Sequence, residues 1–115
     1  MPSALQALRA YQASADSRSL RAQEADIFFR ANGALRTALT GSPVDCARAV
    51  ADNRRLWLTV IGLVQDPENQ LPAGVRAAIV SVGRSVQREM DTASPDLGFL
   101  IIVNENVAAG LSAGL

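Results

Sequence analysis

The chain has 115 residues, which suits a single domain with one modest core. Its 11 arginines balance its 11 acidic residues, and it contains neither lysine nor histidine. Zero net charge argues against a broad electrostatic surface for nucleic acid or an anionic membrane. The lack of histidine removes the commonest general base and most zinc sites. We therefore expect a protein that is not an enzyme and that carries no metal or other cofactor.

The first residues and the cysteine content indicate a compartment. The start of the chain, "MPSALQALRAYQ", lacks the charged and apolar regions of a signal peptide. No apolar run approaches the roughly 20 residues that a membrane span needs. The single cysteine, Cys46, cannot form an internal disulfide, which fits a reducing environment. We expect a cytoplasmic protein that does not insert into membranes.

The first third of the chain has a helical pattern. Aliphatic and small residues supply most of the apolar share of 49%, because aromatic residues make up only 4%. Such a composition favours helices over packed sheets. Leu5, Leu8 and Tyr11, three residues apart, predict a short N-terminal helix that "SADSRS" (14–19) interrupts. The apolar positions from Leu20 to Leu39 keep one helical face and predict a longer helix.

Three further helices follow from their start and stop signals. Ser42, Pro43 and Asp45 form a typical helix start, and this helix should end near Gln65 because residue 66 precedes a proline. The next helix should start within 69–72, and the last should start with Ser94 as its cap. The helix that should start within 69–72 has an apolar seam of Val75, Ile79, Val82, Val86 and Met90. The sequence predicts one all-α domain over residues 1–115, a small bundle of four main helices plus a short N-terminal helix.

Several residues within these helices are candidates for a structural or binding role. Trp57 follows two arginines in "NRRLW", and core packing is the first interpretation, with a position at the rim of a binding groove as the alternative. Asn53 and Asn104 stand on or beside apolar stripes, where their amides require hydrogen-bond partners and often fix helix register. Isolated glycines occur within the helical patterns at 33, 62, 74 and 83. They indicate either close helix approach or a deliberately loose bundle.

The motifs together resemble the flagellar biosynthesis regulator FlaF family. The matching motifs are "AYQ" (10–12), "NRRLW" (53–57), "NQLP" (69–72), "VRAAIVS" (75–81), "VN" (103–104) and "GL" (110–111). Their order spans nearly the whole chain. The resemblance implies a cytoplasmic, non-enzymatic secretion chaperone for flagellin that supports its synthesis and export. It also implies flagellin as the partner and a second regulator, FlbT, as a further candidate partner.

A flagellin segment that forms an amphipathic helix would fit an apolar groove of such a bundle. We expect this groove between the helices predicted over 43–65 and 72–90. Its expected residues are Asn53, Trp57, Ile61, Leu71, Val75, Arg76 and Ile79. Asn53 and Arg76 would supply orienting hydrogen bonds.

The alternative function is post-transcriptional regulation of flagellin translation, through RNA contact or through FlbT. Arg54, Arg55, Arg84 and Arg88 would form one basic strip if the two helices are antiparallel, and would then contact RNA phosphates or charges on a partner. Arg48, Asp52 and Arg55 are also spaced to form a local network of ion pairs on the helix surface, which is an equally good explanation for the arginines of this helix.

Overall fold

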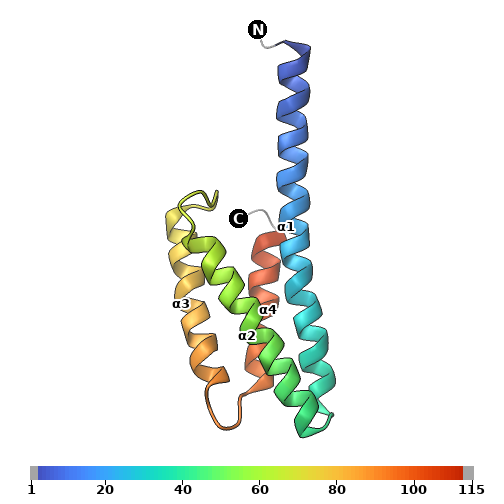
Figure 1. The fold of residues 1–115 in the computed structure, drawn as a ribbon, viewed down its shortest axis with the longest axis vertical. Coiled ribbons are helices and arrows are strands. Elements are labelled where there is room, and N and C mark those ends of the chain that lie inside the picture. The colour runs from blue at the N-terminus through green and yellow to red at the C-terminus, as the bar shows by residue number, and fades with distance from the viewer. Residues whose placement is uncertain (1–2, 113–115) are drawn as a thin grey trace.

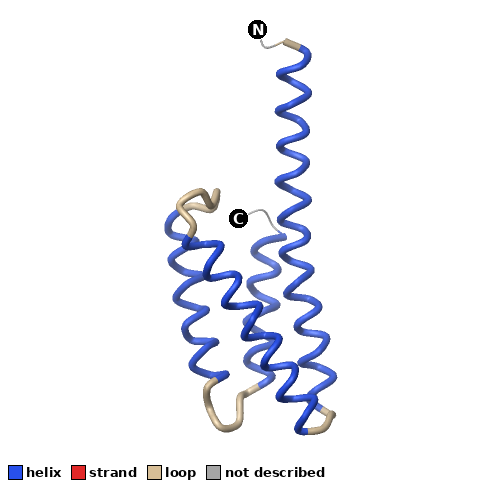
Figure 2. Tube along the Cα trace, viewed as in Figure 1, coloured by secondary structure: helices blue, strands red, loops and turns tan. Residues whose placement is uncertain are grey.

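A computed structural model describes the backbone of residues 3–112 and the side chains of residues 3–8 and 25–111. Within residues 3–112 the chain forms four long α-helices and no strand (Figures 1 and 2). The helices are α1 (Ala4–Leu39), α2 (Pro43–Gln65), α3 (Ala73–Met90) and α4 (Leu97–Ser112). The prediction of an all-α bundle with four main helices is confirmed.

The predicted N-terminal helix is present, but it is continuous with the helix expected from residue 20, so that α1 has 36 residues. The segment "SADSRS" holds neither glycine nor proline, so nothing in it prevents the backbone hydrogen bonds from continuing. Ser3 caps the helix, and its hydroxyl accepts from the backbone N–H of Gln6 at 3.1 Å. The first half of α1 extends beyond the other helices (Figure 1). The side chains of Tyr11 and Leu20, part of the predicted stripes, lie outside the described residues.

The start of α2 has the predicted chemistry. The Ser42 hydroxyl accepts from the Asp45 N–H at 3.2 Å, and the Asp45 carboxylate accepts from the Ser42 N–H at 3.0 Å. The hydrogen bond from the Ser42 backbone lowers the pKa of Asp45 below its ordinary value of 3.8. The start of α4 differs from the prediction, because Asp96, two residues after Ser94, caps this helix by accepting from the Phe99 N–H at 3.0 Å. The side chain of Asp96 can reach the third helical N–H, which Ser94 is too early in the chain to do.

The four helices are not equally attached. Helix α1 packs against α4 and α2, whereas α3 packs chiefly against α2 and has few contacts with α4. Between α1 and α3 there is no contact in the described structure. Figure 1 shows α3 at the side of the bundle opposite α1, joined to α2 above and to α4 below. The helices are therefore joined in the order α4, α1, α2 and α3, and the weak contact that closes this ring is the one between α3 and α4.

The apolar core runs along the middle of the bundle and includes residues of all four helices. Its largest fully buried side chains are Trp57, Phe28, Leu35, Leu100 and Val86. The rings of Phe28 and Trp57 meet edge to face, with centroids 5.6 Å apart and planes at 72°. Trp57 has 0% exposure, which confirms the core interpretation of this residue.

Three fully buried asparagines connect the core helices. The Asn104 amide nitrogen donates to the Asn53 oxygen at 2.7 Å and to the Asn32 oxygen at 3.0 Å, while its own oxygen accepts from the Trp57 indole N–H at 2.9 Å. Asn32 in turn donates to the backbone carbonyl of Ile101 at 3.1 Å. The network joins α1, α2 and α4, and every buried amide in it has a partner. The sequence pattern marked Asn53 and Asn104 but not Asn32.

Of the four glycines that the sequence analysis marked, only Gly83 is required by close packing. A Cβ atom there would lie 2.8 Å from the Ile61 Cδ1 and 3.0 Å from the Trp57 ring. A Cβ at Gly33, Gly62 or Gly74 would meet nothing within 4 Å. Gly83 thus allows α3 to approach α2, while the other three lower helix stability without such a role.

Replacing Asn104 with leucine should destabilise the fold strongly. The substitution leaves the Trp57 indole and two asparagine oxygens buried without partners, so we expect a loss of roughly 3–5 kcal/mol in unfolding free energy. Asn106→Leu, on the exposed side of the same helix, is the matched control and should change stability little. Urea unfolding followed by circular dichroism measures both, and equal effects for the two variants would contradict the role of the network.

Alanine substitutions at two of these glycines should change the unfolding free energy in opposite directions. Gly83→Ala should lower the unfolding free energy by roughly 1–2 kcal/mol, because overpacking against the buried Trp57 ring outweighs the gain in helix propensity. Gly33→Ala should raise it by about 1 kcal/mol, since the added methyl group meets open space. Thermal and urea unfolding of both variants test the difference, and stabilisation by Gly83→Ala would refute the close-packing explanation.

Candidate functional site

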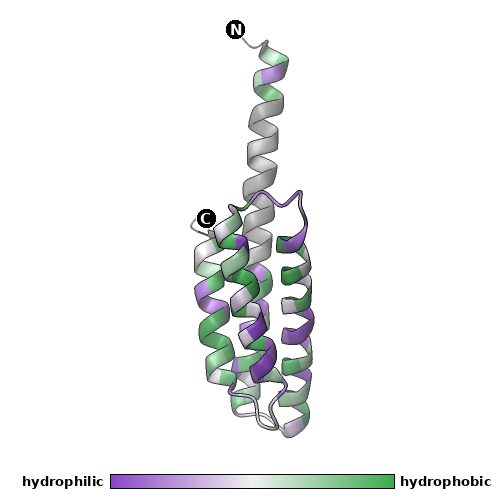
Figure 3. Ribbon diagram, turned by 90° about the vertical axis from the view of Figure 1, so that its left-hand side faces the viewer, coloured by the Kyte–Doolittle hydropathy of each residue, from purple (hydrophilic) through white to green (hydrophobic). Residues whose placement is uncertain are grey.

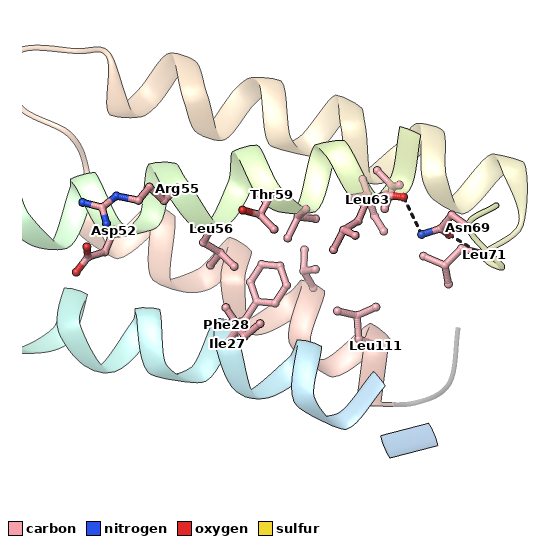
Figure 4. A pocket seen from close by; sticks show the side chains of 14 residues that line it. Ile27, Phe28, Asp52, Arg55, Leu56, Thr59, Leu63, Asn69, Leu71 and Leu111 are labelled. Atoms are coloured by element: carbon pink, nitrogen blue, oxygen red, sulfur yellow. Dashed lines mark hydrogen bonds between the residues drawn. The ribbon is translucent and has the colours of Figure 1, made fainter. Parts of the chain in front are cut away.

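One of the concave features of the described surface is an apolar groove of about 370 Å³ that we call groove A. It lies between α1 and α2 and reaches the 66–72 connection, with parts of α3 and α4 in its floor (Figure 4). It is lined by Ile27, Phe28, Asp52, Arg55, Leu56, Thr59, Val60, Leu63, Val64, Asn69, Leu71, Ile79, Val107 and Leu111. Most of these residues are apolar, so a ligand of matching character would be held chiefly by burial.

One stripe of α2 forms the length of groove A. The stripe runs from Asp52 to Val64 at alternating intervals of three residues and one residue, which keeps it on one helical face. At 1.5 Å per residue it extends about 18 Å, or a little over three turns. Within it Leu63 is 49% exposed, and Ile27 on the facing side of α1 is 48% exposed. Large aliphatic side chains thus stand open to solvent on both walls.

The two ends of groove A are polar and differ from each other. Asp52 and Arg55 stand at one end, and Asn69 stands at the other beside Leu71 (Figure 4). Asn69 is fixed in place, because its amide nitrogen donates to the carbonyl of Leu63 at 3.0 Å and its oxygen accepts from the Leu71 N–H at 2.9 Å. Groove A therefore has a direction, with a charged end and an amide end.

A second groove, groove B, separates α3 from α4 and has a volume of about 330 Å³. Its lining holds no charged residue: Val75, Ala78, Ile79, Val82, Val103, Asn106, Val107, Gly110 and Leu111. Ile79, Val107 and Leu111 line both grooves. In Figure 3 the helix that leads to the C-terminus is hydrophobic along most of its length, and the 66–72 connection is hydrophilic.

The structure distributes the predicted groove residues over three places. Asn53 and Trp57 have 0% exposure, so neither side chain is accessible to a partner in this conformation. Ile61 is half-buried against Gly83, where α2 and α3 close together. The predicted groove between these helices is therefore closed at this level, because a glycine on α3 lets the two backbones approach.

The other predicted residues lie on the two grooves or beside them. Leu71 and Ile79 line groove A, and Val75 lines groove B together with Ile79. Arg76 is half-buried, and its Nε has no hydrogen-bond partner. The contribution of α1, through Ile27 and Phe28, was not predicted. The sequence analysis did not single out Leu63, and it did not predict that this side of α2 lies against α1.

The four arginines that were predicted to contact RNA or a partner have different surroundings in the structure. The Arg54 guanidinium donates to the Asp91 carboxylate at 2.6 Å and to the backbone carbonyl of Met90 at 3.2 Å. It therefore ties α2 to the end of α3. Arg55 lines groove A, while Arg84 and Arg88 are exposed on α3, where Arg88 donates to the Ser85 hydroxyl at 3.1 Å. The described side chains therefore do not form a strip of four free arginines.

The described part of the chain offers few other features that would indicate a function. No cluster of three or more metal-ligating side chains occurs there. Cys46 is half-buried, and its thiol donates to the Ala38 carbonyl at 3.2 Å, so it packs as a small residue. Among the described residues, none of the helices combines the length and apolar character needed to cross a bilayer.

Comparison with known proteins gives one finding. A family model described as flagellar protein FlaF matches residues 7–111. The match covers α1 from its first turns to the end of α4 and includes all residues of both grooves. No curated protein and no solved structure is matched by the chain.

Proposed function

Because this chain belongs to the flagellar protein FlaF family, we propose that it is a flagellin-binding secretion chaperone and that groove A holds a helical flagellin segment. The observation that carries this proposal is the groove itself, an apolar surface with exposed Leu63 and Ile27 on opposite walls. The family resemblance supplies flagellin as the partner. The groove supplies the mode of recognition.

The dimensions of groove A suit one face of an amphipathic helix. A segment of about 12 residues matches the length of about 18 Å, and apolar anchors at i, i+4, i+7 and i+11 would face the α2 stripe. Ordering such a segment on binding offsets roughly 2–5 kcal/mol of the interaction energy. The resulting affinity is moderate, which suits a chaperone that must release its cargo for export.

The polar ends would set the orientation of the bound segment. A helix carries partial positive charge at its N-terminus and partial negative charge at its C-terminus. Asp52 favours a helix N-terminus or a basic side chain, Arg55 favours the opposite, and Asn69 accepts or donates to either. The balance of Asp52 and Arg55 at one end selects between the two directions of the helix.

We extend the proposal to cytoplasmic location, to absence of enzymatic activity and to joint action with FlbT. The role of FlbT would be exerted through another surface, since groove A is the size of one helix. Direct RNA binding is the weaker candidate, because Arg54 is already engaged by Asp91 and Met90.

A charge placed in groove A should disrupt flagellin binding. Leu63→Asp puts a carboxylate on an exposed wall of the groove, so folding should survive while affinity falls at least about tenfold, or about 1.4 kcal/mol. Leu58→Asp is the matched control, because Leu58 is 55% exposed on the same helix but lies outside both grooves. Calorimetry with purified flagellin measures both. Equal affinities for the two variants would place binding elsewhere.

Salt separates the proposed function from RNA binding. Binding of flagellin through groove A should change little between 50 and 200 mM salt, because burial of apolar surface is not screened. Phosphate contacts instead lower the logarithm of affinity by about 0.7 per contact for each unit of log salt on single strands. Tight, strongly salt-dependent binding of the flagellin leader RNA, combined with no binding of flagellin, would favour the alternative.

A further inference from the structure

Helix α3 is anchored at its C-terminal half. All of its buried residues, Gly83, Val86 and Met90, lie there. Gly83 packs against Ile61 and Trp57, and Arg54 binds both Asp91 and the Met90 carbonyl just beyond the helix end. The Asn53 amide also donates to the Met90 sulfur at 3.4 Å. This half of α3 is therefore part of the rigid core.

The N-terminal half of α3, Ala73–Val82, which we call the α3 arm, is attached differently. None of its residues is buried, although Val75, Ile79 and Val82 continue the apolar seam that was predicted to pack. Pro72 precedes it without a side-chain cap. The Nε of Arg76 is buried without an acceptor, which destabilises the present position of the arm. Few contacts and an unsatisfied donor are features of a segment with low local stability.

The α3 arm stands between the two grooves. Ile79 of the arm, with Val107 and Leu111 of α4, forms a wall that both grooves share. On the groove B side, the facing residues include Ala78 and Gly110, whose small size permits close approach of two helices. Movement of the arm toward α4 would fill groove B and withdraw Ile79 from groove A.

We propose that the α3 arm is a movable element, pivoting about Gly83, that closes groove B when a helix enters groove A. Groove B is then the space into which the arm moves, and its apolar faces meet in the bound state. Closing it buries apolar surface of Val75, Val82 and Val103. This burial favours the state in which groove A is wide, so occupancy of groove A and position of the arm are linked. The linkage rests on the function proposed above, whereas the mobility of the arm does not.

Amide hydrogen exchange of the free full-length protein tests the mobility. The amides of residues 77–82 should exchange on the order of tenfold faster than those of 83–90 in the same helix. Residues 47–52 of α2 lie equally far from their own helix start and are the control for ordinary fraying of helix ends. Protection of 77–82 equal to that of 83–90 would overturn the proposal.

A pair of neighbouring alanines tests the linkage. Ala78→Leu fills groove B with a side chain that touches no part of groove A, and should hold the arm in its present position. It should slow exchange of residues 77–82 and weaken flagellin binding about tenfold. Ala77→Leu, an exposed position outside both grooves, makes the same chemical change and should alter neither quantity.

The two readouts separate the two proposals. If the parent protein does not bind flagellin but residues 77–82 exchange fast and Ala78→Leu slows them, the proposed function fails and the movable arm stands. If the parent binds flagellin and both alanine variants bind it equally well, the linkage fails and the proposed function stands.

Discussion

The buried asparagine network is the constraint on which the rest of the bundle depends. A core of leucine, valine and alanine permits neighbouring helices to slide by a turn with little change in burial. Asn104 prevents such sliding, because its amide nitrogen must donate to Asn32 and Asn53 while its oxygen accepts from Trp57. A shift of any one helix would leave several polar groups buried and unpaired. The network thereby fixes the register of α1, α2 and α4.

The position of Trp57 follows from the same network. Its indole N–H is the donor that completes the asparagine cluster, so the ring is held in the interior and packs on Phe28. The face of α2 that carries Trp57 is thus used for the core. The residues left for a partner are those of the adjacent stripe, which includes Leu63 and faces Ile27 of α1. Core and groove are neighbouring faces of one helix.

Helix boundaries were predictable where local chemistry decides them. Ser42, Pro43 and Asp45 start α2 as expected, and Pro67 explains its end. The continuity of α1 was missed because a polar segment was interpreted as a break although it contains no helix breaker. The start of α4 was displaced by two residues because serine and aspartate are both good caps, and only the structure shows that Asp96 is the one used.

The site was less predictable than the fold, for a physical reason. Val75 and Ile79 were identified because their spacing reveals an apolar face, and they do line the grooves, as does the expected groove residue Leu71. Periodicity does not say which helix lies opposite that face. Ile27 and Phe28 come from a helix far away in sequence, and the single absent Cβ at Gly83 decides that α2 and α3 close at Ile61.

The uneven attachment of α3 separates two requirements that conflict in a small protein. Binding a helix in groove A, as proposed, would need a preorganised wall, and α1 and α2 would provide it on a framework fixed by hydrogen bonds. Release needs a part of the groove that can change position without unfolding the rest. Because α3 is outside the asparagine network except through Met90, the proposed movement of its first half would leave the register of the other helices unchanged. Under the proposed function, a core that included the whole of α3 would still bind a helix, but no part of groove A could then move to release it.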